Sequence, residues 1–169
     1  MFEKILKDAS SKWDILNSPN NIWIRVSYGA SGQAAGADKV FEKLKSLASG
    51  KNNVFVSLVG SMGLSYAEPL VDITFNNGIR VFYNNVDINT AEHIFNSHVN
   101  DNDINHKYVF GQIAPDQSEP INGIIQIDKE KPLSLTKKIA TANCGNISPT
   151  DIYQYIANDG YSALERALN

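Results

Sequence analysis

Two short runs of β-branched and aromatic residues, with a helical pattern between them, constrain the fold of this chain more than any other feature. Ile22 to Ser27 and Val54 to Val59 each have the composition of a strand, and the second is a short apolar run, consistent with a strand buried on both faces. From about Ala37 to Ala48, apolar residues recur at helical spacing. This order predicts two parallel strands joined by a crossover helix.

A hairpin is predicted to follow. Leu70 to Phe75 and Ile79 to Tyr83 flank Asn76-Asn77-Gly78, and Asn-Gly between two apolar runs is the strongest short-range hairpin signal. Helical patterns cover residues 1 to about 16, before the first strand, and about Thr90 to Val99, after the hairpin. The resulting order, α-β-α-β-β-β-α, is that of a thioredoxin-like sheet with helices on both faces, so we predict an α/β fold.

The last third of the chain has two parts of different character. Residues 100–138 are polar, are interrupted by prolines and hold one good strand candidate, Ile124 to Ile127, so they are interpreted as an extended linker or wrapping arm. Residues 139–169 are again organised, with two short helices separated by Asp159-Gly160.

Capping patterns predict where two of the helices begin. Asn89 with Glu92 resembles a capping box, and Ser148-Pro149-Thr150-Asp151 supplies a serine cap with proline at the first helical position. The helix that follows is expected to turn its apolar residues inward, and these are Ile152, Tyr155 and Ile156.

Composition excludes several classes of function. With 15 basic and 18 acidic side chains and a net charge of −3, the chain has no electrostatic footprint for nucleic acid or anionic lipid. The start lacks a signal-peptide pattern, and no stretch approaches the roughly 18 apolar residues of a membrane span, so we expect a cytoplasmic protein without membrane insertion. A single cysteine, Cys144, rules out an internal disulfide framework.

Two loops rich in small residues follow the two parallel strands. The first runs from Ser27 to Ala37 and the second from Val59 to Leu70. Because the carboxyl ends of neighbouring parallel strands lie at one edge of a sheet, the loops should meet there, where α/β folds build their sites. Glu68-Pro69 is interpreted as the turn into the third strand.

These loops resemble those of one iron-sulfur family. The second loop is similar to the motif Gly-Cys-x-Gly-x-Cys-x-x-Glu-Pro-Leu-Val of the thioredoxin-like [2Fe-2S] ferredoxin domain, with Ser61 and Ser65 at the cysteines. The first is similar to Gly-Thr-Cys-Gly-x-Ala-Ala-Gly-Ala, with Ser31 at the cysteine. Some members instead have their first-loop cysteines at the positions of Ser27 and Gly32.

The family is the N-terminal domain of the NADH-binding flavoprotein subunit of NADH:quinone oxidoreductases and hydrogenases. Asn143 to Pro149, Tyr155 to Ala157 and Gly160 to Leu164 are similar to the segment that leads into the flavin domain of that subunit. The resemblance divides the chain into a ferredoxin domain at 1–99, a linker at 100–138 and a lead-in segment at 139–169. It implies FMN, NAD and [4Fe-4S] sites only in domains that this chain lacks, and other subunits of such a complex as partners.

Serine at the family's cysteine positions changes the expected chemistry. A [2Fe-2S] cluster takes four deprotonated soft ligands, usually thiolates, whereas serine offers a hard hydroxyl of high pKa. Serine makes up 15 of 169 residues, so chance would place it at positions 31, 61 and 65 about once in a thousand. The pattern indicates replaced ligands within a retained loop geometry, and therefore no bound cofactor and no metal.

Other candidate sites are weaker. His93, His98 and His106 lack metal-ligand spacing, and no Gly-x-Ser-x-Gly elbow or triad makes a serine a nucleophile. The glycines of the first loop lack the lysine or acid of a nucleotide-binding loop. Cys144 is expected to be a packed thiol.

Three functions stay open at the level of sequence. The first is a cluster-free, degenerate ferredoxin domain that is a structural or docking component of an NADH dehydrogenase or hydrogenase complex and is not catalytic alone. The second is an active [2Fe-2S] electron carrier, with unusual ligation or in a form with the cysteines. The third is a stand-alone adaptor. The presence of iron separates the first two, and co-purification separates the first from the third.

Overall fold

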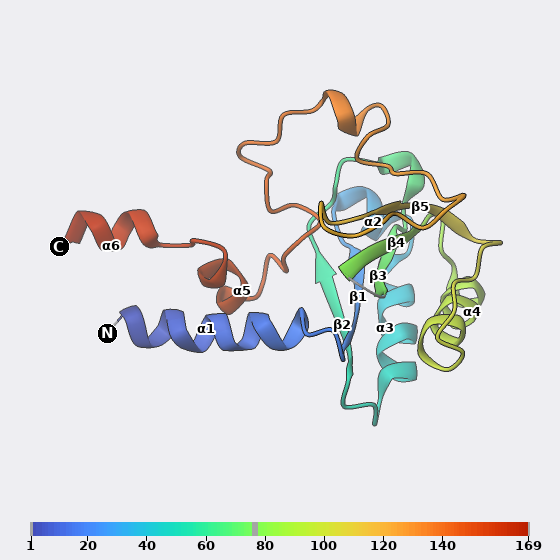
Figure 1. Ribbon diagram of the computed structural model, residues 1–169, viewed down its shortest axis with the longest axis horizontal. Helices are drawn as coiled ribbons and strands as arrows, with labels where there is room; N and C mark the ends of the chain where they lie inside the picture. Colours follow the sequence, from blue (N-terminus) through green and yellow to red (C-terminus); the bar gives the residue numbers. More distant parts are fainter. Residues whose placement is uncertain (1, 76–77, 169) are drawn as a thin grey trace.

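The structure is a computed structural model that describes residues 2–75 and 78–168 (Figure 1). Its strands are β1 (Ile22–Ser27), β2 (Val54–Val59), β3 (Val71–Phe75), β4 (Ile79–Tyr83) and β5 (Val109–Ile113). Its α-helices are α1 (Phe2–Leu16), α2 (Ala30–Ala34), α3 (Ala37–Ala48), α4 (Ile88–Val99), α5 (Ile152–Ala157) and α6 (Ser162–Leu168). Two 3-10 turns complete the described elements, η1 (Ser65–Ala67) and η3 (Leu133–Leu135).

One mixed sheet with the strand order β2-β1-β3-β4-β5 organises the fold. β1 and β2 are parallel, with Ile22 opposite Val54, whereas β3 is antiparallel to both β1 and β4. This is the predicted unit of one parallel crossover followed by an antiparallel hairpin, and it confirms the α/β class. Asn76 and Asn77 of the predicted hairpin turn lie outside the described residues.

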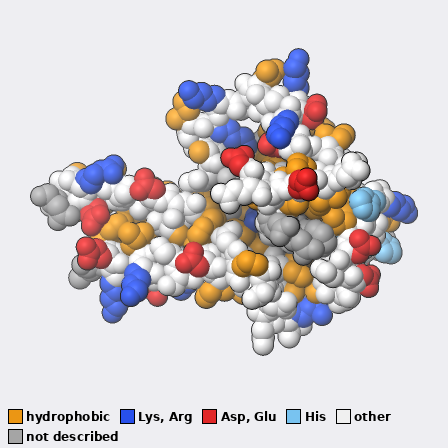
Figure 2. Space-filling model, viewed as in Figure 1, with side chains coloured by type: hydrophobic (Ala, Val, Ile, Leu, Met, Phe, Trp, Pro, Cys, Tyr) orange, Lys and Arg blue, Asp and Glu red, His pale blue; other side chains and the backbone are white. Residues whose placement is uncertain are grey.

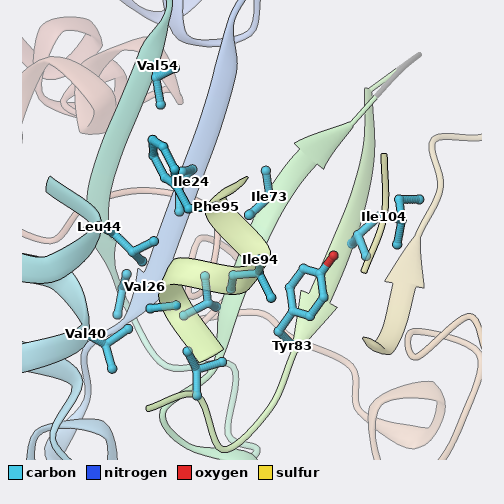
Figure 3. Close-up of a cluster of buried hydrophobic side chains, with 14 of the residues drawn as sticks. Ile24, Val26, Val40, Leu44, Val54, Ile73, Tyr83, Ile94, Phe95 and Ile104 are labelled. Atoms are coloured by element: carbon cyan, nitrogen blue, oxygen red, sulfur yellow. The ribbon is translucent and has the colours of Figure 1, made fainter. Parts of the chain in front are cut away.

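The main core lies between one face of the sheet and helices α3 and α4 (Figure 3). Alternate residues of a strand point to opposite faces, so Ile24 and Val26 of β1 reach this core together. They meet Leu44 of α3 and Phe95 of α4, which are both almost completely buried. The alternation leaves Trp23, Arg25 and Ser27 of β1 for the other face.

That other face is partly polar. Arg25 donates to Asp72 of β3 at 2.7 Å, and Arg80 of β4 donates to the same carboxylate at 2.8 Å. Arg80 also donates to the carbonyl oxygen of Gly145 and to Asn146, and so it holds the C-terminal segment against the sheet. The buried charges are therefore paired, as burial requires.

The fifth strand is a correction to the sequence prediction. Ile124–Ile127 does not form a strand of its own, since Gln126 makes only an isolated bridge to Gln112, and β5 lies instead at Val109–Ile113 within the expected linker. The fully buried amide of Gln112 donates to the carbonyl oxygens of Ile121 and Ile124. The segment after β5 thereby covers the edge of the sheet, which explains why a polar residue is tolerated in that strand.

Both predicted helix caps are wrong by a few residues. Asp87, rather than Asn89 with Glu92, caps α4 by accepting from the backbone N–H of Thr90 at 2.7 Å. Asp151, rather than Ser148, caps α5. Aspartate is as good an N-cap as serine. Asp87 and Asp151 each lie one residue before their helix, so the point at which the backbone enters the helix, and not the residue type, determines which residue caps it.

Helix α5 also differs in the face that it buries. Ile156 is buried as predicted, but Ile152 and Tyr155 are 54% and 44% exposed. Of the described helices, none is both long enough and apolar enough to cross a membrane.

Candidate functional site

The two loops meet at the carboxyl ends of β1 and β2. Ser27 is the last residue of β1 and is buried, and Ser61 lies two residues beyond the end of β2. Gly29 is so close to Ser61 that a Cβ at position 29 would lie 2.8 Å from the serine Cβ. The absence of a side chain at Gly29 thus allows the loops to pack directly against each other.

Glu68 lies at the centre of this junction. Ser27 donates its hydroxyl to Glu68 Oε1 at 2.6 Å, and Ser61 donates to the same oxygen at 3.1 Å. The backbone N–H of Leu70 donates to Oε2 at 2.9 Å, and the whole residue is 5% exposed. Three donors from three parts of the chain satisfy the buried carboxyl group, as a buried polar group requires.

Gly32 of helix α2 lies against the same carboxyl group. A Cβ at position 32 would lie 2.7 Å from the carbonyl oxygen of Ser27 and 3.3 Å from Glu68 Oε2. A backbone oxygen cannot move aside as the end of a flexible side chain can. A cysteine at position 32 would therefore require the end of β1 to shift.

The remaining two serines are placed differently. Ser31 is half-buried in α2, a short helix within the segment that the sequence predicted as a loop, and Ser65 is exposed at the start of η1. Within residues 2–75 and 78–168, the hydrogen bonds to the Glu68 carboxyl group come from Ser27, Ser61 and Leu70. Of the four serines, the structure thus joins Ser27 and Ser61.

Cys144 is far from the loops in sequence but lies against the second loop in space. A Cβ at Gly60 would lie 3.5 Å from both the Sγ and the Cα of Cys144. The backbone N–H of Gly60 donates to the carbonyl oxygen of Ile147, and Gly145 lies directly against Met62. Residues 144–147 therefore pack against the second loop and support it.

Sequence reasoning missed the central role of Glu68, which it took for part of a turn. The available signal was the position of Glu68 between small residues and an apolar strand. Its carboxyl group accepts from the backbone N–H of Leu70, two positions later. A buried acid needs several donors. The hydroxyls of Ser27 and Ser61 and the backbone N–H of Leu70 supply these donors.

The residues of the junction do not fit a [2Fe-2S] cluster. The chain has one cysteine, and the hydroxyls of Ser27 and Ser61 already donate to Glu68. In the part of the chain that the structure describes, no group of three or more His, Cys, Asp or Glu residues is arranged to hold a metal ion. With hard hydroxyls occupied by a carboxyl group, the junction offers a closed hydrogen-bond network instead of a thiolate ligand set.

The network predicts different costs for replacing different serines. Ser27→Ala removes a short, buried hydrogen bond to a carboxyl group and should lower the free energy of unfolding by about 2 kcal/mol. Ser61→Ala should cost about 1 kcal/mol, because its bond is longer and less buried. Ser65→Ala, at an exposed position, is the matched control and should stay within about 0.5 kcal/mol of the parent in urea denaturation. Equal losses for all three variants would contradict the network.

Comparison with known proteins gives matches among solved structures alone. No family model matches the chain, and no curated protein matches it. A thioredoxin-like [2Fe-2S] ferredoxin from Aquifex aeolicus aligns at 13% identity with a TM-score of 0.48, over 59% of this chain and 99% of that one. A second structure of the wild-type ferredoxin aligns at 14% identity with a TM-score of 0.46, over 54% of this chain and 98% of that one. A cysteine-to-serine variant of it aligns at 16% identity with the same TM-score of 0.46, over 53% and 98%. Likenesses at this level carry no argument about what the chain does.

Proposed function

We propose that this chain is a cluster-free, degenerate thioredoxin-like ferredoxin domain that serves as a structural or docking component of an NADH dehydrogenase or hydrogenase type complex. The observation that carries the proposal is the hydrogen-bond network of Ser27, Ser61 and Glu68. It occupies the junction where the resembled family would have thiolates. Side chains that are hydrogen-bonded to one another in this way stabilise a loop junction and do not serve as ligands for iron.

Iron content tests the cluster-free part of the proposal. The chain, expressed in its native host and purified without oxygen, is expected to contain no stoichiometric iron and to lack visible absorption, because one cysteine cannot supply four soft ligands. The comparison protein is the fourfold variant Ser27→Cys, Ser31→Cys, Ser61→Cys, Ser65→Cys, reconstituted under the same conditions. About two irons per parent chain would contradict the proposal and favour the active electron carrier with unusual ligation.

Co-purification tests the docking part. A tagged chain at its native expression level should purify with a flavin-containing assembly that oxidises NADH, which the resemblance to the flavoprotein subunit supports. The same tag on an unrelated α/β domain of similar size is the control. Recovery of the chain without any flavin protein would favour the stand-alone adaptor.

A further inference from the structure

The segment after β5 carries an exposed asparagine that is followed directly by glycine, Asn122-Gly123. The two residues form the tip of a β-turn, in which the backbone N–H of Ile124 donates to the carbonyl oxygen of Ile121 at 3.3 Å. Gly123 has a φ of +80°, a value that favours glycine at the third position of such a turn. The turn therefore holds an asparagine before a glycine at the surface, where water reaches both residues.

The backbone nitrogen of Gly123 is free to react. Within residues 2–75 and 78–168, no acceptor lies within hydrogen-bond distance of its N–H, and a Cβ at this position would meet no atom beyond its chain neighbours within 4 Å. Asp159-Gly160 shows the protected case, because the buried Gly160 donates its N–H to the carbonyl oxygen of Tyr155 at 2.9 Å. An N–H that is held by an acceptor gives up its proton slowly, and the N–H of Gly123 has no such protection.

A free glycine nitrogen beside an asparagine side chain supports a defined reaction. The nitrogen of Gly123 gives its proton to hydroxide and forms a bond to Cγ of Asn122, while the Cγ–Nδ2 bond breaks and Nδ2 takes a proton from water and leaves as ammonia. The product is a succinimide ring. Water then opens the ring: cleavage between the nitrogen and the backbone carbonyl carbon gives isoaspartate, and cleavage between the nitrogen and Cγ gives aspartate. Nothing is oxidised or reduced, and water is the reactant that is consumed.

The turn that contains this asparagine is held by a buried amide. Gln112 of β5 is fully buried, and its Nε2 donates to the carbonyl oxygens of Ile121 and Ile124, each at 2.8 Å. The backbone N–H of Ile121 donates in return to Gln112 Oε1 at 2.8 Å. One amide thus binds both ends of the turn, and its two hydrogen bonds depend on the separation of the two carbonyl groups.

Isoaspartate changes that separation. Its backbone runs through Cβ and Cγ of residue 122, so the chain becomes longer by a methylene group between the two carbonyl groups that Gln112 binds. A buried amide that loses one of these partners is left with an unsatisfied donor. The added negative charge should matter little by itself, since the formal net charge is −3 and Figure 2 shows acidic and basic side chains interspersed over one face of the molecule.

We propose that Asn122 is a deamidation site, and that the isoaspartate formed there releases the segment after β5 from the edge of the sheet. Release leaves the edge of β5 without its cover, and an unpaired strand edge is a template for pairing with other chains. This inference goes beyond the proposed function and does not depend on whether the junction holds iron.

Peptide mapping of the full chain tests the modification. During incubation at about 37 °C and about pH 8, residue 122 should gain about 1 Da at least about tenfold faster than Asn96, which precedes Ser97 inside helix α4, where helical hydrogen bonds hold the attacking nitrogen. A protein isoaspartate methyltransferase should transfer a methyl group to the same position. Asn122→Gln is the matched control and should accept no methyl group there. Equal rates at Asn122 and Asn96 would overturn the proposal.

Limited proteolysis tests the release. The deamidated fraction, separated from the parent chain by anion exchange, should be cleaved within residues 114–127 at least about fivefold faster than the parent, because the segment opens more often. Asn122→Asp carries the added charge without the longer backbone, so its cleavage rate should stay within about twofold of that of the parent. If the deamidated fraction is cleaved no faster than Asn122→Asp, the turn accommodates isoaspartate in place, and the proposed release is wrong.

Discussion

Replacing Asp72 by alanine is expected to lower the free energy of unfolding by about 3–5 kcal/mol, because it leaves the buried guanidinium group of Arg25 and the half-buried one of Arg80 without their counter-charge. Arg25 and Asp72 are 3% and 4% exposed, and Arg25 Nη2 lies 2.6 Å from Asp72 Oδ1. Burial alone would raise the pKa of Asp72, but the charges and hydrogen bonds of Arg25 and Arg80 outweigh burial and hold that pKa below its ordinary value.

Burial also disfavours the charged form of Arg25. Burial lowers the pKa of Arg25 to about 10, with Asp72 offsetting part of the effect. Removal of Asp72 takes away that compensation. The loss should extend beyond the ion pair, because Arg80 also holds Gly145 and Asn146 beside the second loop.

Urea denaturation of Asp72→Ala measures this cost. The matched control is Asp101→Ala, at an exposed aspartate just beyond α4, which should change the free energy of unfolding by no more than about 0.5 kcal/mol. A loss below about 1 kcal/mol for Asp72→Ala would show that water reaches the two guanidinium groups and that the pair is not buried in solution.

The first four strands were predictable because each carries the information locally. Ile22–Ser27 and Val54–Val59 are rich in β-branched and apolar residues, and their bounds in the structure are those predicted. The fifth strand was not predictable in this way. It contains Gly111 and Gln112, and it forms a strand by pairing with β4, while its buried Gln112 amide donates to the distant carbonyl oxygens of Ile121 and Ile124.

Part of the candidate site could also be predicted from the sequence, and part could not. That the two loops would meet followed from the rule that parallel strands end at one edge of a sheet, and the hydrogen bonds of Ser27 and Ser61 to one oxygen agree with it. That Glu68 fills the space between the loops did not follow. In the sequence, a carboxyl group two positions before an apolar residue is typical of a turn, and its burial depends on the tertiary fold. The approach of Cys144 to Gly60 is also invisible locally, since it depends on how the C-terminal segment returns across the sheet.

A second large effect is expected from His98, in the pH dependence of stability. His98 is 2% exposed on α4, and its Nε2 lies 2.6 Å from the hydroxyl of Tyr83 on β4. Burial lowers the pKa of His98 from 6.5 to about 4, and nearby Asp103 raises it by less. The folded protein therefore keeps this imidazole neutral at pH values where the unfolded chain binds a proton.

The sign of the effect follows from proton binding. Between pH 6.5 and about 4 the unfolded state holds more protons at this position than the folded state, so acidification through this window favours unfolding. The shift corresponds to about 3 kcal/mol of stability that is present at pH 7 and lost by about pH 4. The carboxyl groups with lowered pKa values, Asp72, Asp87 and Glu92, have ordinary values of 3.8, 3.8 and 4.5, so their contributions fall away at lower pH.

Urea denaturation at pH values from 7 to 4.5 should show this loss in the parent chain. His98→Gln keeps a polar side chain beside Tyr83 but cannot titrate, so its stability should depend on pH much less between 6.5 and 4.5. His93→Gln, at an exposed position of the same helix, is the matched control and should reproduce the slope of the parent. If His98→Gln keeps the slope of the parent, another group carries the acid sensitivity, and the imidazole between α4 and β4 is protonated without cost to the fold.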